Sequence, residues 1–328
     1  MSIAATVGVP IITGIPTCIH DGFVAIERLR GVNQTYLLYV LKSLEGELRS
    51  AGQTGSQSNV NTEIVNGLLI NLPPEPDQKR IAEVLWDADD QIATLERLIT
   101  KKQAIKQGMM QQLLTGKTRL SGFTAPWRAG VSLGNLCEKR SGYWGSDTIT
   151  PSADIVAGVI RAGDISGDGH LVGTAVRYLS SSEWNKASCH VDDVVITASG
   201  NRLGKTFYVR TPSKLAASNF VRILRPRASV SGEYLAYVMQ SSKARQELEA
   251  HTATSAYPNL LPSFFAEPWL IVPSYDEQIA IVTVLRSSDA QIDALRIRLT
   301  KAKDIKQGMM QELLTGRTRL ALEKGRHE

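Results

Sequence analysis

The strongest constraint on this chain is an internal repeat with a period of 200 residues. Residues 105–120 read IKQGMMQQLLTGKTRL, and residues 305–320 read IKQGMMQELLTGRTRL. The similarity extends upstream at the same spacing and without gaps. Its identical pairs include Pro73/Pro273, Gln78/Gln278, Ile81/Ile281, Val84/Val284, Leu85/Leu285, Asp89/Asp289, Gln91/Gln291, Ile92/Ile292, Leu95/Leu295 and Thr100/Thr300. Solenoid repeats are only about 20–50 residues long, so the chain contains a duplicated module instead.

The repeated segment has the pattern of a long helix. Apolar residues recur mostly three or four positions apart, which is the spacing of one stripe along a helix. The stripes are Leu85, Ala88, Ile92, Leu95, Ile99, Ile105, Met109 and Leu113 in the first copy, and Leu285, Ile292, Leu295, Leu299, Ala302, Ile305, Met309 and Leu313 in the second. Pro73-Pro74 precedes the first helix and Gly116 supplies its stop. About 40 helical residues extend about 60 Å.

A helix of that length with a single apolar stripe needs a partner along its whole extent. The other copy has a nearly identical stripe of the same length, which predicts that the two helices pair as a coiled coil. The alternative is that each helix packs only on its own globular domain.

The globular parts flank these helices unequally. We predict a partial first domain over residues 1–74, a helix over 75–120, a complete domain over 121–273, a second helix over 274–320 and a tail over 321–328. The complete domain is expected to be α+β. Its strand-like runs begin at Asp193, Thr206 and Phe220, and a helix is expected over Ser231–Glu249.

Residues 1–74 match only the back half of the complete domain. The run beginning at Asp21 aligns with the run beginning at Ser218, and Tyr36-Leu-Leu-Tyr-Val aligns with Tyr234-Leu-Ala-Tyr-Val. No counterpart of residues 121–190 precedes them. The predicted order is therefore half a domain, a helix, a whole domain and a helix.

Charge distribution is more informative than the net charge of +5. Residues 97–137 contain seven basic residues and no acid, and residues 194–232 again contain seven basic residues and no acid. Such stretches suit a polyanion such as DNA, although an ordinary solvated face has the same composition.

The three cysteines are far apart, which favours a reducing cytoplasm. The sequence has no apolar run long enough to span a bilayer, and its N-terminus lacks the basic start of a signal peptide.

These features together resemble a known family. Each copy has a Pro-x-x-x-(Asp/Glu)-Gln entry into a long helix that ends in KQGMMQxLLTGxxRL, and each helix follows a globular domain. This arrangement resembles the specificity subunit of type I restriction-modification systems over nearly the whole chain. The helix ends at residues 106–120 and 306–320 are its most specific part. The second domain adds Trp127 through Leu133-Gly-Asn-Leu, Arg161-Ala-Gly-Asp-Ile and the run beginning at Asp192.

The resemblance implies an α+β fold in which two target-recognition domains are joined by two long antiparallel helices. Each domain would read one half of a two-part DNA sequence, and the helices would fix the separation. Methyltransferase subunits would methylate adenine with S-adenosylmethionine, and restriction subunits would add ATP- and magnesium-dependent translocation and cleavage. This chain would hold no cofactor. It departs from the family pattern because the front of its first domain is missing. A natural truncation, a late start codon, or a missing part borrowed from another subunit or a second copy would each explain this.

The DNA-contacting residues are predicted from side-chain chemistry and position in the second domain. Arg, Lys, Asn, Gln, Ser and Thr suit base edges, and Arg and Lys also bind phosphates. The candidates form three groups: Lys139, Arg140, Ser141, Tyr143 and Trp144; Asn201, Arg202 and Lys205; and Ser255, Tyr257 and Asn259. The candidates for docking the methyltransferase are Met109, Met110, Leu113, Leu114, Met309, Met310, Leu313 and Leu314.

Catalytic motifs are not evident. Asn71-Leu-Pro-Pro differs from the motif with which adenine methyltransferases hold a flipped base, and it is better explained as a strand-to-helix junction. The run from Gly200 to Thr206 lacks the spacing of a phosphate-binding loop. Cys189-His190 has no second pair to complete a zinc site. The alternatives to a recognition subunit are a scaffold or inhibitor without sequence-specific DNA binding and a stand-alone nuclease or methyltransferase.

Overall fold

The computed structural model describes residues 1–3, 7–51, 60–144, 155–253 and 258–320. The chain divides into two compact units. Unit 1 comprises residues 1–101 and 292–328, and unit 2 comprises residues 102–291. In the described ranges no helix combines the length and the apolar character that crossing a membrane requires.

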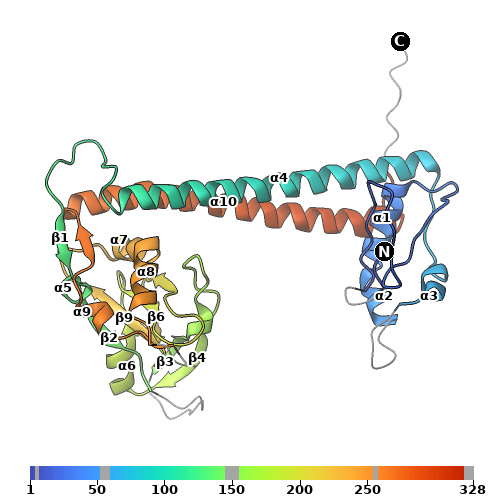
Figure 1. The fold of residues 1–328 in the computed structure, drawn as a ribbon. Helices are drawn as coiled ribbons and strands as arrows, with labels where there is room; N and C mark the ends of the chain where they lie inside the picture. Colours follow the sequence, from blue (N-terminus) through green and yellow to red (C-terminus); the bar gives the residue numbers. More distant parts are fainter. Residues whose placement is uncertain (4–6, 52–59, 145–154, 254–257, 321–328) are drawn as a thin grey trace. The chain divides into compact units, whose positions relative to one another are not determined.

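The two repeated segments form helices α4 (Glu75–Leu113) and α10 (Tyr275–Leu314). Each unit contains part of each helix, residues 75–101 and 292–314 in unit 1 and residues 102–113 and 275–291 in unit 2, and within each unit the two parts lie side by side (Figure 1). They run antiparallel. In unit 2 the Lys106 Nζ lies 2.6 Å from the Asp289 Oδ1, and in unit 1 the Lys306 Nζ lies 2.6 Å from the Asp89 Oδ1. The expected α+β fold with two long antiparallel helices is confirmed.

Both helices end just before the glycine that the sequence indicates as the stop. The first ends at Leu113, and Gly116 adopts a φ of +70° that turns the chain away from the helix. Thr118 N then donates to Gln112 O at 3.2 Å, which closes the turn. Gly316 does the same for α10 with a φ of +73°. The residues after each helix therefore fold back toward its end.

Unit 2 contains most of the remaining elements. They are β1 (Arg128–Val131), α5 (Leu133–Leu136), β2 (Cys137–Ser141), β3 (Ile155–Ile160), η1 (Ala162–Asp164), β4 (Ala175–Leu179), α6 (Ser181–Ala187), β5 (Ser188–Cys189), β6 (Val194–Thr197), β7 (Thr206–Tyr208), β8 (Leu215–Ala217), β9 (Val221–Pro226), α7 (Gly232–Met239), α8 (Ser242–Ala250), α9 (Ser263–Ala266) and β10 (Leu270–Val272). The sheet orders are β1-β10, β2-β9-β6-β7 and β4-β3-β8-β5. The three strand-like runs of the sequence become β6, β7 and β9.

The prediction of one continuous helix over Ser231–Glu249 is wrong. The structure has two helices, α7 and α8, separated at Gln240 and Ser241. Ser241 begins the second helix because its Oγ accepts a hydrogen bond from Ala244 N at 3.2 Å. A serine in this position favours a new N-terminus over a continued helix.

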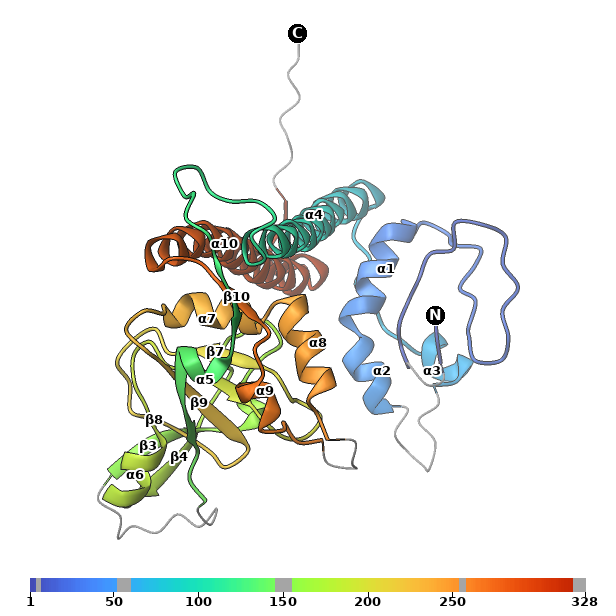
Figure 2. The same cartoon turned by 60° about the vertical axis from the view of Figure 1, so that its left-hand side comes forward.

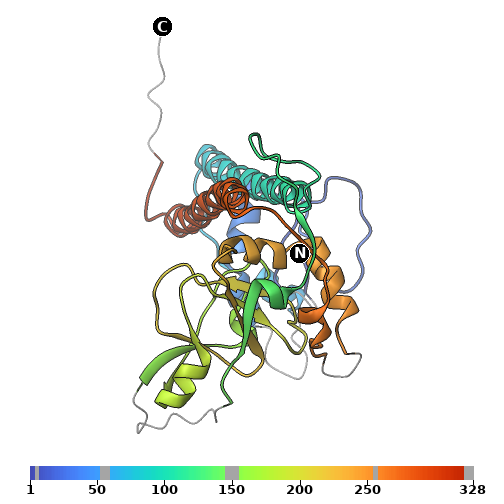
Figure 3. The same ribbon diagram turned by 90° about the vertical axis from the view of Figure 1, so that its left-hand side faces the viewer.

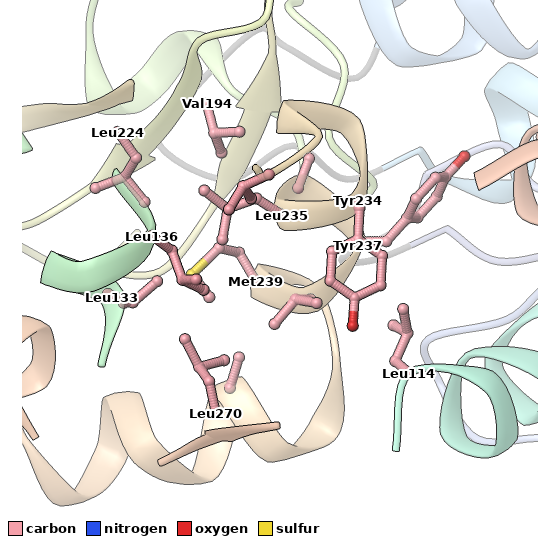
Figure 4. Packing of buried hydrophobic residues seen from close by; sticks show 14 of the residues in the cluster. Leu114, Leu133, Leu136, Val194, Leu224, Tyr234, Leu235, Tyr237, Met239 and Leu270 are labelled. Carbon is pink, nitrogen blue, oxygen red and sulfur yellow. The ribbon is translucent and has the colours of Figure 1, made fainter. Parts of the chain in front are cut away.

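Helix α7 is the centre of the unit 2 core. All of its residues are buried, and it lies between the helix pair and the sheet β2-β9-β6-β7 (Figures 2 and 3). Leu235 packs in one cluster with Val194 and Leu224 of the sheet, and Leu114 lies beside Tyr234 and Tyr237 (Figure 4). The sheet is therefore fixed to the helix pair through α7.

Unit 1 surrounds the opposite halves of the two helices. Its shorter helices are α1 (Gln34–Ser43), α2 (Glu45–Ala51) and α3 (Thr62–Asn66). Helix α1 corresponds to α7, and its Tyr36 and Tyr39 are completely buried against α4 and the end of α10. Among its described residues the only strand-like pairing is the isolated bridge between Ser2 and Phe23.

Candidate nucleic-acid interface

A Tyr–Asp–Lys contact attaches α7 to both long helices in unit 2. The Tyr237 hydroxyl donates to the Asp289 Oδ2 at 2.6 Å, and Lys106 from α4 binds the other carboxylate oxygen. The Lys106 Nζ also lies 5.2 Å from the centre of the Tyr237 ring. Burial, followed by the Asp289 hydrogen bond, raises the pKa of Tyr237, so its hydroxyl remains a donor.

Unit 1 repeats this contact with equivalent residues. The Tyr39 hydroxyl donates to the Asp89 Oδ2 at 2.8 Å, and the Lys306 Nζ lies 5.3 Å from the Tyr39 ring centre. Burial by itself would raise the pKa of Asp89, but hydrogen bonds from Lys306 and Tyr39 outweigh it, and the pKa is lowered. Asp89 thus remains charged, and the duplicated Tyr–Asp–Lys contacts hold both helices to each globular part.

A buried glutamine at the start of each long helix makes a second duplicated contact. The Gln278 Oε1 accepts from Ser231 N at 3.0 Å, and its Nε2 donates to the carbonyls of Ser229 and Pro273. Gln78 makes the same set in unit 1, where its Oε1 accepts from Asn33 N at 2.8 Å. This is the residue of the Pro-x-x-x-(Asp/Glu)-Gln motif, and it fixes where each globular part meets its helix.

In unit 2, the predicted DNA-contacting groups lie at one end of the four-stranded sheet β2-β9-β6-β7. Strand β2 ends at Ser141 opposite Arg222, and β6 ends at Thr197 opposite Val221. Both strands flank β9, so the segments that follow Ser141 and Thr197 emerge at the same end. Two regions more than 50 residues apart in sequence are therefore neighbours.

The loop from residue 198 to residue 205 is held in a defined conformation. Gly200 and Gly204 adopt φ values of +78° and +85°, and Lys205 N donates to the Thr197 Oγ1 at 2.9 Å. Arg202 is exposed, and its Nη1 donates to the Gly163 carbonyl at 2.9 Å. The geometry is that of a turn between β6 and β7.

Residues 258–260 lie directly against this loop. Gly200 N donates to Pro258 O at 2.8 Å, and Leu260 N donates to Ala198 O at 2.9 Å. An isolated bridge joins Ser199 to Asn259, which is exposed. The structure thus brings Asn259 beside the Asn201–Arg202 turn, whereas Ser255 and Tyr257 lie outside the described residues.

The group that follows α5 is divided between structural and exposed positions. The Lys139 Nζ lies 4.7 Å from the Phe265 ring centre, and the Arg140 Nη2 donates to Asn185 O at 2.6 Å. Ser141 is exposed, and Tyr143 forms an isolated bridge with Ser218. Trp144 has 80% of its surface exposed. The turn toward Trp144 requires glycine at 142, because a Cβ there would lie 1.9 Å from Ser218 O.

Arg222 is a candidate that the sequence reasoning missed. It opposes Ser141 at the same end of the sheet and is half-buried. Its Nη1 donates to Asn219 O at 2.7 Å, and burial lowers its pKa. It lies in the acid-free stretch 194–232, so the charge pattern contained the signal, but only the strand register places it among the other groups.

The side chains predicted to dock a methyltransferase lie largely in the cores. Met110, Leu113 and Leu114 are buried in unit 2, and Leu313 and Leu314 are buried in unit 1. Met109, Met309 and Met310 are only partly buried and remain accessible. Contact with a partner through these residues stays a prediction.

The described residues contain no group of three or more His, Cys, Asp or Glu side chains placed to hold a metal ion. Burial raises the pKa of the Cys137 and Cys189 thiols to about 12, so neither is a thiolate at neutral pH.

Comparison with known proteins finds similarity to one family of DNA-specificity proteins. The profile of the type I restriction modification DNA specificity domain matches residues 1–107. The chain is 23% identical to the type I restriction enzyme MjaVIII specificity subunit of Methanocaldococcus jannaschii, over 88% of this chain and 71% of that protein. It is 29% identical to the StySPI specificity subunit of Salmonella potsdam, over 38% of this chain and 27% of that protein.

A solved structure shares the fold. The type I restriction-modification S subunit from M. genitalium superposes with a TM-score of 0.56 at 15% identity, covering 87% of this chain and 73% of that one. The duplicated helices and the repeated contacts at their ends accompany a similarity to specificity subunits along most of the sequence. The chain is similar in sequence to the specificity subunits of type I restriction-modification systems and shares their fold.

Proposed function

We propose that this chain selects the DNA site of a type I restriction-modification complex and catalyses no step itself. The observation that supports this most directly is the end of the four-stranded sheet in unit 2. There, Asn201 and Arg202 lie beside Asn259, and Ser141 and Trp144 emerge from the neighbouring strand. Amide, hydroxyl and guanidinium groups are suited to base edges and phosphates, and an exposed aromatic ring can contact a base.

In this proposal unit 2 reads one part of a two-part target, and unit 1 contributes to reading the second part. The paired helices connect the two, and their ends bind methyltransferase subunits. The partner subunits supply S-adenosylmethionine-dependent adenine methylation and ATP- and magnesium-dependent cleavage, in the cytoplasm where the DNA is.

The direct test is to map adenine methylation. The chain is co-expressed with a cognate methyltransferase subunit, and N6-methyladenine is located in host DNA by long-read sequencing. A two-part motif with a fixed gap is expected. A palindrome of one half-site would mean that two copies of unit 2 read the DNA, so that unit 1 contributes no readout. No motif, despite stable co-purification, would overturn the recognition role in favour of a scaffold or inhibitor.

Variants of the turn test the surface itself. The double substitution Arg202→Ala with Lys205→Ala is expected to weaken DNA binding by the complex at low salt. It should also reduce the slope of log affinity against log salt by up to about 2, since each phosphate contact contributes about 0.9. The matched control, Lys79→Ala with Lys301→Ala, removes two exposed lysines from α4 and α10. Equal binding by both double variants would remove this turn from the interface.

A further inference from the structure

A pocket of about 710 Å³ lies beside the turn between β6 and β7 in unit 2. Its walls are the end of that turn, the junction of α7 and α8, and the side of α8 that carries Arg245 and Glu249. Pro258 also borders the pocket, and its carbonyl accepts a hydrogen bond from Gly200 N at 2.8 Å. The pocket therefore adjoins the turn that presents Arg202.

Two glycines allow the walls of this pocket to approach one another closely. Gly204 adopts a φ of +85°, and a Cβ there would lie 2.7 Å from the Leu248 Cδ1 on α8. A Cβ at Gly169 would lie 2.7 Å from the Gln240 Nε2 at the end of α7. The turn therefore packs directly on α8, and this packing fixes where the side chains of that helix stand relative to the turn.

The pocket carries an excess of positive charge. Lys205 and Arg245 both border it, the first half-buried and the second exposed. Within the part of the chain that the structure describes, neither cation forms an ion pair or a side-chain hydrogen bond. By contrast, Lys243 of the same helix pairs with Glu247. Glu249 is the only acid among the described residues that border the pocket, so two unpaired cations stand beside one carboxylate.

We infer that this pocket binds a phosphate of the DNA backbone, with Arg245 and Lys205 as its two cationic ligands. The inference rests on the proposed function, in which the neighbouring turn contacts base edges. Arg245 then positions the DNA, because phosphate contacts fix the orientation of a protein on a duplex without reading its sequence. A guanidinium can donate two parallel hydrogen bonds to a phosphate, and the ammonium of Lys205 adds a second charge.

The position of the pocket favours a backbone phosphate over other anions. Each groove of a duplex is bordered by the two phosphate backbones, so a turn that enters a groove has phosphates beside it. In unit 2 the wall of α8 stands directly beside the turn, with Arg245 on the side that borders the pocket. The two cations are thus placed to contact the backbone next to the bases that Asn201 and Asn259 would read.

Fluorescence anisotropy of the chain in complex with its cognate methyltransferase subunit tests the contact. Two duplexes of equal length are compared, one with the motif found by methylation mapping and one with that motif scrambled. Arg245→Gln should weaken binding to both duplexes by the same factor, roughly three- to tenfold, and reduce the slope of log affinity against log salt by about 0.9, since one phosphate contact is lost. The matched control, Arg227→Gln, changes an exposed arginine that follows the opposite end of β9 and should bind like the wild type.

The acid of the pocket provides a test of opposite sign. Glu249→Gln removes the negative charge that opposes a phosphate, so it should strengthen binding to both duplexes about twofold or more. Both Arg245 and Glu249 are exposed, so the thermal unfolding midpoints of the two variants should match that of the wild type. Damage to the fold would weaken binding in both variants and could not produce opposite changes. Weaker binding or unchanged binding of Glu249→Gln would contradict an anion in this pocket.

Neutralisation of single phosphates locates the contact. In a scan of methylphosphonate substitutions along the motif duplex, one position should weaken binding of the wild-type complex but cause no further loss in Arg245→Gln. Absence of such a position, unchanged binding of Arg245→Gln, or a loss confined to the motif duplex would overturn the inference. Loss of methyltransferase co-purification in Arg245→Gln would assign the pocket to that subunit and overturn it as well.

Failure of the proposed function has a different signature. A wild-type complex without preference for the motif duplex would overturn sequence recognition alone, because the uniform loss in Arg245→Gln is measured on both duplexes and still tests the phosphate contact.

Discussion

Unit 1 and unit 2 hold the two long helices with the same contacts, but they cover the helix ends differently. Gln78 and Gln278 make equivalent sets of hydrogen bonds, and Asp89 and Asp289 each bind a tyrosine of their own unit and a lysine of the opposite helix. In unit 2 a tryptophan, a strand and a short helix then close the surface. In unit 1 the corresponding surface is open in the described part of the chain.

The difference shows which interactions are local to the repeat and which depend on the rest of a domain. The glutamine and carboxylate contacts use only α1 or α7 and the two helices, so they form in both units. The cover over the strand segment comes from residues 127–136, and no segment takes that place in the described part of unit 1. Substitutions can therefore separate the two kinds of contact.

The largest effect is expected in unit 2 from Arg225→Ala. The Asp193 side chain is 1% exposed and binds Arg225 through both oxygens, at 2.9 and 2.8 Å. Removal of the arginine would leave a buried, uncompensated carboxylate and lower the free energy of unfolding by about 3–4 kcal/mol. Denaturant unfolding measures this loss, and hydrogen exchange should report it in unit 2 while unit 1 stays protected. Equal loss in both units would contradict the independence of their cores.

Trp127→Ala is expected to make unit 2 resemble unit 1. Loss of the half-buried indole and of its hydrogen bond to Glu277 should destabilise unit 2 by about 2–3 kcal/mol. Hydrogen exchange of β10 should rise toward that of residues 70–72. Trp144→Ala, at an 80% exposed position, is the control and should leave the unfolding midpoint unchanged. An unchanged β10 in the Trp127 variant would mean that the indole does not stabilise the strand pairing.

The duplicated glutamines should respond alike. Gln78→Ala and Gln278→Ala each leave a buried backbone N–H and two carbonyls without their side-chain partner, so each should cost about 2 kcal/mol of unfolding free energy. Thermal unfolding of the two variants provides the comparison. A much larger effect at one position would show that the two junctions, despite matching geometry, do not contribute equally to the free energy of unfolding.

The smallest effect is a pH dependence confined to unit 2. A hydrogen bond to Glu267, followed by one to the Glu247 carbonyl, raises the pKa of His251 above its usual 6.5. A raised native pKa contributes stability that is complete below the unfolded pKa and is lost as pH rises through the native value. Unit 2 should therefore become slightly less stable as pH rises above about 6.5.

His251→Gln should remove that dependence, and NMR titration of the imidazole gives the native pKa directly. His251, Glu247 and Glu267 all lie in unit 2, so hydrogen exchange in unit 1 should show no matching change. A His251 pKa at or below 6.5 would contradict the proposed contact with Glu267.

The sequence by itself determined the duplicated helices, their antiparallel pairing through the family resemblance, and the strands that became β6, β7 and β9. A period of 200 residues and an apolar stripe can be recognised in the sequence without knowledge of distant contacts. The break between α7 and α8 was missed, because a capping serine at 241 decides it against an otherwise continuous apolar pattern.

Tertiary structure alone decided which polar residues become neighbours. Asn259 lies against the turn at Asn201, and Arg222 faces Ser141, through strand pairing between segments far apart in sequence. It also decided that Lys139 packs on Phe265 while Trp144 is exposed. The open surface of unit 1 was equally invisible, because a cavity is defined by what surrounds it.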